Sequence, residues 1–169
     1  MGFCGKSVRL SLVAGVMGLS VSLAAIWAPS FAHAEACAVD TVLLRGDWGE
    51  ARFSVAVADD EGERAQGLMH VEEMARSAGM LFVYERERSV RFWMRNTLIP
   101  LDMIFADASG TVQKVHVNAE PLSERLIHGG DNIQYVLEVN GGLAKQLGID
   151  AGSELRHPSI DAARAAWPC

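Results

Sequence analysis

The sequence predicts an α+β domain, a small and strongly curved sheet or barrel of short strands with one or two short helices. Most apolar residues fall in short runs that alternate with polar residues, as strands do. Turns rich in glycine and aspartate separate these runs, which suits hairpin connections. Only two segments, near residues 60–75 and 142–147, carry helical signals. This combination is typical of strand-rich domains with few helices.

The first 34 residues have the three parts of a secretory signal. Lys6 and Arg9 precede an apolar stretch over residues 10–27, and Ala32-His33-Ala34 matches a cleavage site. A retained membrane anchor is the competing interpretation, but glycine and serine interrupt the stretch. We therefore expect a signal peptide over residues 1–34, a periplasmic or secreted location, and one globular domain over residues 35–169 without stable membrane insertion.

Charge excludes one class of partner. The expected mature chain keeps 13 of the 15 basic residues and all 21 acidic residues, a formal charge of −8. A strongly acidic domain repels the phosphate backbone, so nucleic acid is not expected as a partner.

Two cysteines remain after cleavage, Cys37 and Cys169, near the two ends of the mature chain. An exported location permits disulfides, and the ends of compact domains often lie close together. We expect these two residues to form a disulfide. A free thiol or an intermolecular bridge is the alternative.

Strands are expected along most of the chain, because their segments are rich in β-branched and aromatic residues. Residues 46–49 and 107–110 are the turns of two hairpins. The charged residues 85–88 are interpreted as a solvated turn, and Pro100 as a bend, since proline cannot donate to a strand ladder. The predicted strands cover residues 39–45, 53–57, 80–83, 89–95, 101–106, 111–117, 133–139 and 152–156.

A capping-box pattern, Asp60 with Glu63, predicts a helix that begins near Glu61. It either continues past Gly67 toward residue 75 or ends at that glycine.

A second short helix is expected over residues 142–147, between Gly141-Gly142 and Gly148. Residues 118–132 contain proline and glycine with little periodicity, and they are the longest predicted irregular segment. Loops of this kind often line functional sites.

Five sequence blocks, taken together, resemble a known family. They are residues 63–69, 79–82, 92–97, 100–102 and 135–138, with the sequences ERAQGLM, GMLF, FWMRNT, PLD and YVLE. Their order and spacing resemble those of the domain of unknown function 192 family over about residues 53–155. One departure is Arg95, where many relatives have lysine, so the charge is kept but the hydrogen-bond geometry is not. The resemblance implies a compact, strand-rich domain, found in bacteria and archaea and often exported, and it implies no substrate, cofactor or catalytic residue.

Polar and aromatic residues cluster in the block around Trp93. If residues 89–95 form a strand, alternation places on one face Arg91, Trp93, Arg95 and Thr97, and on the other Phe92, Met94 and Asn96. An aromatic plane beside two guanidinium groups suits a sugar ring, a carboxylate or a phosphate. The candidate ligand-binding residues are Arg64, Trp93, Arg95, Asn96 and Asp102.

Our leading hypothesis is a non-catalytic domain that binds a polar or anionic small ligand or a cell-envelope component. One alternative is an envelope hydrolase or carbohydrate-active enzyme with Asp102 as general acid or base. Another is a structural or interaction domain in which Arg95 pairs with Asp102, and Arg64 bridges to a carboxylate such as Glu138. Whether the chain is an enzyme stays open.

Metal binding is a weaker alternative. The expected mature chain combines several methionines with four histidines, and thioether with imidazole can hold copper(I). Met69-His70 is the only adjacent pair, however, and methionine in apolar runs is usually core filler. We predict no metal ligands and no cofactor.

Overall fold

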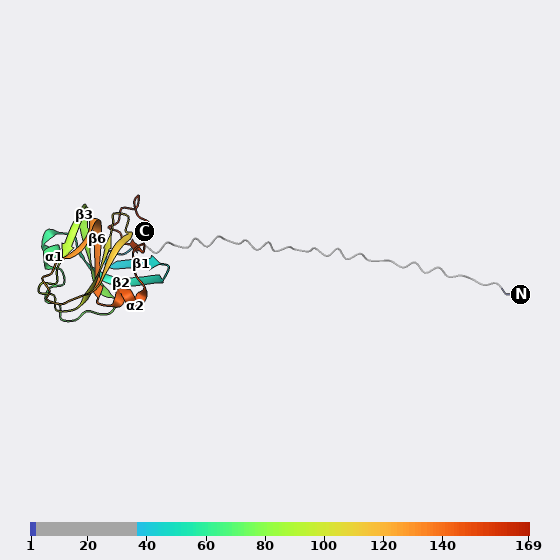
Figure 1. The fold of residues 1–169 in the computed structure, drawn as a ribbon. Helices are drawn as coiled ribbons and strands as arrows, with labels where there is room; N and C mark the ends of the chain where they lie inside the picture. The colour runs from blue at the N-terminus through green and yellow to red at the C-terminus, as the bar shows by residue number, and fades with distance from the viewer. Residues whose placement is uncertain (3–36) are drawn as a thin grey trace. The chain divides into compact units, whose positions relative to one another are not determined.

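The computed structural model describes residues 1–2 and 37–169, so nearly all of the expected signal peptide lies outside the described residues. Seven strands and two short helices follow one another in the chain (Figure 1). Their bounds are β1 Thr41–Gly46, β2 Gly49–Ala58, α1 Glu61–Gln66, β3 Ala78–Phe92, β4 Leu101–Ala106, β5 Val112–Ala119, β6 Ile127–Asn140, α2 Leu143–Leu147 and β7 Glu154–Arg156. No helix among the described residues is long and apolar enough to cross a membrane.

The strands form one curled sheet in the order β5-β4-β6-β3-β2-β1-β7. The first and last strands of this order approach each other, because Thr111 bridges to Glu154 and the Val112 N–H donates to the Ser153 carbonyl at 2.8 Å. The sheet therefore curls into a barrel-like form, as the sequence predicts. One pair, β2 with β3, is parallel, and α1 lies in the connection between them.

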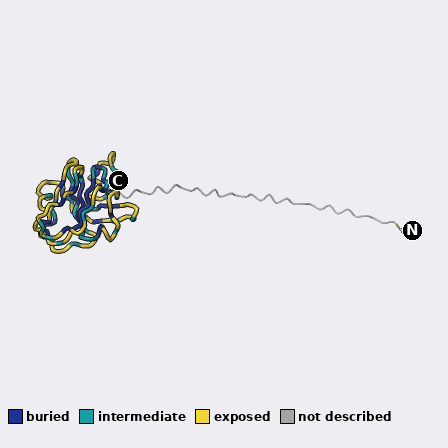
Figure 2. The backbone as a smooth tube through the Cα atoms, in the orientation of Figure 1, coloured by how far each residue is buried: buried dark blue, intermediate teal, exposed yellow. Residues whose placement is uncertain are grey.

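Apolar side chains cover both faces of the sheet, so β4 and residues 135–139 of β6 are buried throughout (Figure 2). All six residues of β4 are buried, which explains its almost uninterrupted apolar sequence. One core, inside the curl, includes Phe53, Tyr135 and Leu137. The second core, on the opposite face, includes Phe82 and Phe105 and lies beneath α1 and the loops around it.

Two sequence predictions about the middle of the chain are wrong. Residues 85–88 are not a turn, because β3 runs unbroken through them with exposed side chains and an irregular register against β6. The pairing of β3 with β6 shifts register between Val83 and Arg88 and then resumes up to Phe92, so these residues bulge out of the ladder and can carry charges on both faces. The irregular segment is also shorter than predicted, since β5 and β6 extend into it and leave only residues 120–126.

The capping-box prediction for α1 is confirmed. The Asp60 carboxylate accepts a hydrogen bond from the Glu63 N–H at 2.7 Å, and the helix ends after one and a half turns. Gly67 stops it, with φ at +50°, a conformation that residues with a side chain rarely adopt. The ring of Phe82 would also lie 3.2 Å from a Cβ atom at this position.

The predicted disulfide is present, with 5.7 Å between the Cα atoms of Cys37 and Cys169. The segment before Cys169 packs on the barrel, because the guanidinium groups of Arg45 and Arg156 lie 4.5 and 5.4 Å from the centre of the Trp167 ring. The bond thus joins the two ends of the described domain across 132 residues.

Replacing both Cys37 and Cys169 by serine is expected to lower the free energy of unfolding by about 2–4 kcal/mol, because the unfolded chain regains the entropy of an open loop. Urea unfolding of the oxidised protein and of the double variant measures the difference. Equal midpoints for the two proteins would show that the bond contributes nothing to stability.

Candidate functional site

A pocket with a volume of about 200 Å³ opens between α1 and the second core. We call it the α1 pocket. Four segments far apart in the sequence build it: α1 with its following turn, β3, the loop after β3, and β6. The residues that line it are Arg64, Ala65, Gln66, Gly67, Leu68, Met69, Phe82, Tyr84, Arg91, Phe92, Trp93, Thr97 and Glu138.

Glu138 is the unusual member of this lining, because it is a carboxyl group with only 4% of its surface exposed. Its strand neighbours, Met80 on β3 and Met103 on β4, are apolar. No hydrogen bond or ion pair reaches its carboxyl group from the residues that the structure describes. Burial without a partner raises its pKa to about 8, so the group is mostly protonated at neutral pH.

Arg64 is held in place by the backbone. Its Nη1 donates to the carbonyl of Asp59 and, at 2.9 Å, to that of Val83, which ties α1 to β3. Its guanidinium lies over the ring of Tyr84, at 5.2 Å. The bridge to Glu138 that the sequence suggested is not formed, although both side chains line the pocket.

Tyr84 and Arg91 complete the polar lining from β3. Burial raises the pKa of the Tyr84 hydroxyl, so it stays protonated at neutral pH. Arg91 is exposed, and it makes no ion pair within the described part of the chain.

Trp93 lines the pocket, but not from a strand. The predicted strand over residues 89–95 ends at Phe92, and residues 93–100 form a loop, so strict alternation does not apply to them. Trp93 is 42% exposed, and the guanidinium of Arg95 lies over its ring, 5.4 Å from the ring centre. Arg95 itself is not among the pocket residues, and it lies 4.0 Å from the exposed carboxylate of Glu124.

Asn96 supports the pocket from outside. Its φ of +57° is in the left-handed region that asparagine tolerates, and its carbonyl accepts the His70 N–H at 2.9 Å. Its side-chain amide points at the sulfur of Met69, at 3.7 Å. Asn96 therefore fixes the turn after α1 against the loop after β3.

Asp102 does not share this surface, which corrects the expected convergence. Met103 pairs with Glu138, so alternation along β4 directs Asp102 to the opposite face of the sheet. There it is fully buried, and its carboxylate accepts the backbone N–H groups of Asn118, Gly142 and Ala144 at 2.6, 2.8 and 2.7 Å. Asp102 therefore anchors the start of α2 and the end of β5.

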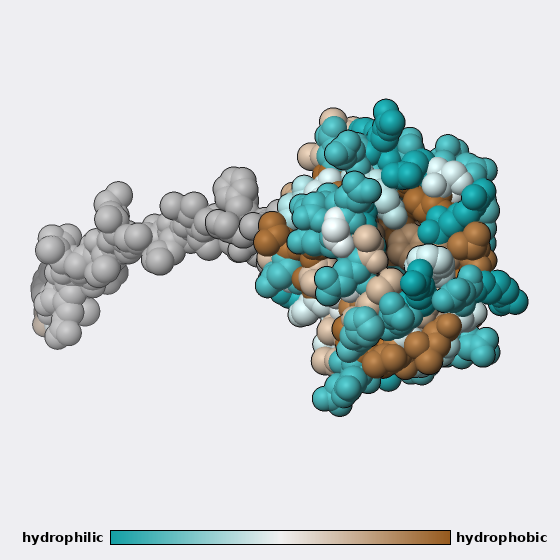
Figure 3. Space-filling model, turned by 90° about the vertical axis from the view of Figure 1, so that its left-hand side faces the viewer, coloured by the Kyte–Doolittle hydropathy of each residue, from teal (hydrophilic) through white to brown (hydrophobic). Residues whose placement is uncertain are grey.

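The loops beside the α1 pocket carry exposed apolar side chains. The Met94 N–H donates to the Ser123 carbonyl, and the Leu122 N–H to that of Thr97, so residues 93–99 and 120–126 form one surface. Leu98, Leu122 and Leu126 are exposed there. Figure 3 views the side of the domain that carries α1, where brown apolar patches interrupt a hydrophilic surface.

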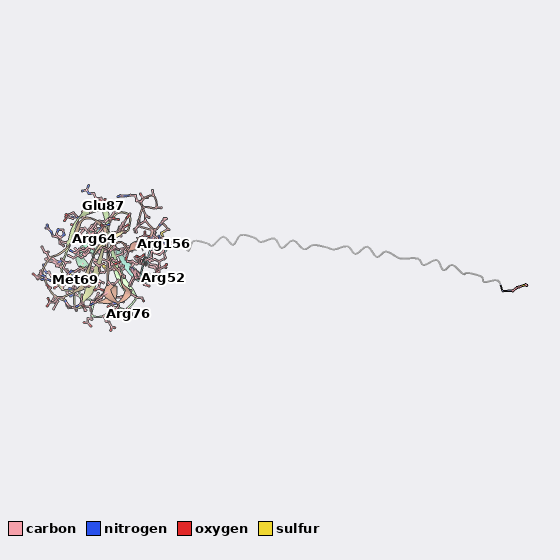
Figure 4. All side chains as sticks on the ribbon, turned by 45° about the vertical axis from the view of Figure 1, so that its right-hand side comes forward. Arg52, Arg64, Met69, Arg76, Glu87 and Arg156 are labelled. Carbon is pink, nitrogen blue, oxygen red and sulfur yellow. A yellow bond between two sulfur atoms is a disulfide. The ribbon has the colours of Figure 1, made fainter. Side chains whose placement is uncertain are left out.

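A second hollow, of about 670 Å³, is larger but less suited to recognition. It lies between the β1–β2 turn and the segment after α2, and several of its polar groups bond to each other. Trp48 donates to Ser153 at 2.9 Å, and Arg45 pairs with Glu154 at 2.6 Å. In Figure 4, Arg64 and Met69 of the α1 pocket lie on one side of the domain, away from Arg52 and Arg156.

Of the residues that the sequence predicts to bind a ligand, Arg64 and Trp93 line the α1 pocket. The sequence also places Arg91 on the same face as Trp93, but it gives Tyr84 no role and gives Glu138 no ligand-binding role. The available signal was a glutamate within the apolar run of residues 135–139, a residue type that is almost never buried without a partner.

Three comparisons place the chain among known proteins. The model of the DUF192 family, described as "Uncharacterized ACR", matches residues 42–157. A protein from Sinorhizobium meliloti 1021, described as a "putative transcription regulator", is 39% identical, with 73% of this chain and 97% of that chain covered and a TM-score of 0.70. A protein of unknown function from Novosphingobium aromaticivorans DSM 12444 is 36% identical, with 72% and 93% covered and a TM-score of 0.68. No curated protein matches the chain.

Proposed function

The chain belongs to the DUF192 family of uncharacterised proteins, and on that premise we propose that it is a non-catalytic domain that binds a small polar or anionic molecule in the α1 pocket. One observation carries the proposal. Four of the five sequence blocks on which the family resemblance rests, residues 63–69, 79–82, 92–97 and 135–138, each contribute side chains to this pocket.

The chemistry of the lining supports the same function. Convergent polar groups in an otherwise apolar hollow are typical of small-molecule sites. Arg64 and Arg91 offer donors, Glu138 offers a buried carboxyl group, and Trp93 offers a ring face. A purely structural network would leave these groups paired with each other.

A hydrolase that uses Asp102 gains no support, because three backbone N–H groups occupy the enclosed carboxylate. The Sinorhizobium protein is described as a "putative transcription regulator". We do not propose DNA binding for this chain, because its expected mature charge of −8 would repel the phosphate backbone.

We also propose that the domain acts outside the cytoplasm. Its first 34 residues have the composition of a secretory signal, and its disulfide is a bond that oxidising compartments maintain. The ligand is then a molecule of the periplasm or of the surroundings, free or as part of an envelope component.

A thermal-shift screen of residues 35–169 with amino acids, sugars, organic acids and peptidoglycan fragments tests the function. For each compound that stabilises the protein, Trp93→Ala is expected to weaken binding about three- to tenfold, because ring contacts contribute about 0.5–1.5 kcal/mol. Titration calorimetry measures the dissociation constants.

Arg91→Gln is expected to weaken the binding of anionic compounds about tenfold or more, since charge-assisted hydrogen bonds contribute about 1.5–3 kcal/mol. The matched control is Arg86→Gln, an exposed arginine of the same strand that does not line the α1 pocket. If no compound binds, or if both arginine variants weaken binding equally, the pocket is not the site.

A further inference from the structure

Two arginines line the α1 pocket without an acidic partner. Arg64 bonds to backbone carbonyls through Nη1, which leaves donors on Nε and Nη2, and Arg91 makes no ion pair among the described residues. The chain has 21 acidic residues against 15 basic ones, so carboxylates are plentiful elsewhere on it. Two guanidinium groups that line one hollow and are paired with no carboxylate among the described residues are equipped to receive an anion from outside.

Glu138 can also bind an anion in this pocket when its carboxyl group is protonated. A neutral carboxyl group is both a hydrogen-bond donor and an acceptor, whereas an ionised one only accepts. In this pocket the group is 4% exposed and unpartnered within the described residues, so its O–H has no acceptor of the protein's own. The oxygen of a bound anion would supply that acceptor, and the buried polar group would then be satisfied.

The dimensions and walls of the pocket limit the rest of the ligand. A cavity of about 150 Å³ is large enough for benzene, and the α1 pocket holds about 200 Å³. Phe82, Phe92 and Trp93 are among its walls. A single ring that carries one charged group fits this space.

Building on the function proposed above, we infer that the ligand is a small organic acid with a ring-sized body. Its carboxylate accepts hydrogen bonds from Arg64 and Arg91 and one from the carboxyl group of Glu138, and its ring lies against Trp93. The selectivity of the site then depends on Glu138, which must be neutral to donate and would repel the anion once ionised.

The titratable groups around Glu138 define the expected pH window. Arg64 on α1 and Arg91 on β3 are the arginines that line the pocket, and the raised pKa of Tyr84 keeps its hydroxyl protonated. His116 on β5 lies in the same row of side chains, beyond Met103, and burial and the charge of Lys114 lower its pKa, so it is neutral above pH 7. Glu138, with a pKa of about 8, is then the group facing the pocket that titrates between pH 7 and 9.5.

Two matched sets of probes test the inference on residues 35–169. They are benzoate, benzyl alcohol and benzylamine, and glucuronate, glucose and glucosamine. At pH 6.5 each acid is expected to bind at least tenfold more tightly than its neutral and basic counterparts, as followed by NMR titration. The affinity for the acids is expected to fall about thirtyfold between pH 6.5 and 9.5. Binding requires the protonated form of Glu138, and this form is depleted above its pKa of about 8.

Two variants separate the role of Glu138 from a loss of fold. Glu138→Gln keeps a donor without a titrating proton, so it is expected to bind the acids within threefold of wild type at pH 6.5 and to lose the pH dependence. Glu138→Met keeps the volume but has no donor, and it is expected to bind them at least tenfold more weakly, with its fold checked by far-UV circular dichroism.

The outcomes distinguish this inference from the broader proposal. Tighter binding of the alcohols or amines, or acid binding that does not change up to pH 9.5, overturns the carboxylate assignment and leaves a small-molecule site in place. If none of the six probes binds, the inference fails. If the compound screen also yields no ligand, the proposed function fails with it.

Discussion

Asp102→Ala is expected to lower the free energy of unfolding by roughly 4–6 kcal/mol, because each buried N–H left without an acceptor costs about 1–3 kcal/mol. Three such groups, on Asn118, Gly142 and Ala144, depend on this one carboxylate. Two of them lie at the start of α2, which has no other side-chain cap. Loss of Asp102 should therefore release α2 and the end of β5 together.

Urea unfolding at neutral pH measures this effect, and amide hydrogen exchange over residues 140–148 locates it. Asp102→Asn should lower the free energy of unfolding less than Asp102→Ala does, since the amide oxygen of asparagine can still accept two of the three hydrogen bonds. Asp131→Ala is the control, because that aspartate has 82% of its side chain exposed. A loss of less than 1 kcal/mol for Asp102→Ala would contradict the anchoring role and reopen a functional one.

Glu138→Gln is expected to raise the free energy of unfolding by roughly 3–5 kcal/mol at pH 8, although it removes no strain and adds no contact. The direction of this change follows from the proton on the carboxyl group of Glu138. The folded protein holds it up to a pKa of about 8, and the unfolded chain releases it near 4.5. Between these values the unfolded state binds fewer protons, so the wild type loses stability as pH rises, and this loss levels off above pH 8. Glutamine has no proton to lose.

Urea unfolding of wild type and Glu138→Gln should therefore give similar free energies at pH 4.5 and diverge steadily up to pH 8. Glu124→Gln is the matched control, an exposed carboxylate with 70% of its side chain accessible, and it should change stability by less than about 0.5 kcal/mol at either pH. A difference between wild type and Glu138→Gln that is constant with pH would show that Glu138 is ionised in the folded protein.

The glutamate thus weakens the fold at the position where it lines the α1 pocket. Residues that lower the stability of a fold and make no stabilising contact in it are expected at functional sites. Asp102 shows the opposite pattern, since its carboxylate is fully used by the backbone. The two buried acids on neighbouring strands are distinguished by their partners, and only the unpartnered one points to function.

Much of the fold could be predicted from local sequence. The hairpin of β1 and β2, the capping box at Asp60, and the glycines that bound α2 all depend on neighbouring residues, and the structure confirms them. The turn predicted for residues 85–88 failed because a charge run has the same composition in a solvated turn as in an exposed bulge of a strand.

The site was harder to predict because it depends on register between distant strands. No local pattern shows that Met103 pairs with Glu138, yet this pairing decides that Asp102 and the α1 pocket lie on opposite faces. Similarly, Trp93 and Arg95 do come together, as predicted, but through a stacked loop after Phe92 and not through strand alternation.

The meeting of β7 with both β1 and the start of β5 also bears on how fast the molecule can form. Leu44 of β1 pairs with Leu155 of β7, more than a hundred residues away in sequence. Thr111, just before β5, pairs with Glu154 of β7, some forty residues away. The ring of strands closes only when both of these distant pairings have formed. Topologies dominated by such distant pairings fold in about milliseconds to seconds, against microseconds for helical bundles. Without β7, β1 would present an open edge that other chains can join, so the pairing of β7 with β1 protects the sheet from aggregation.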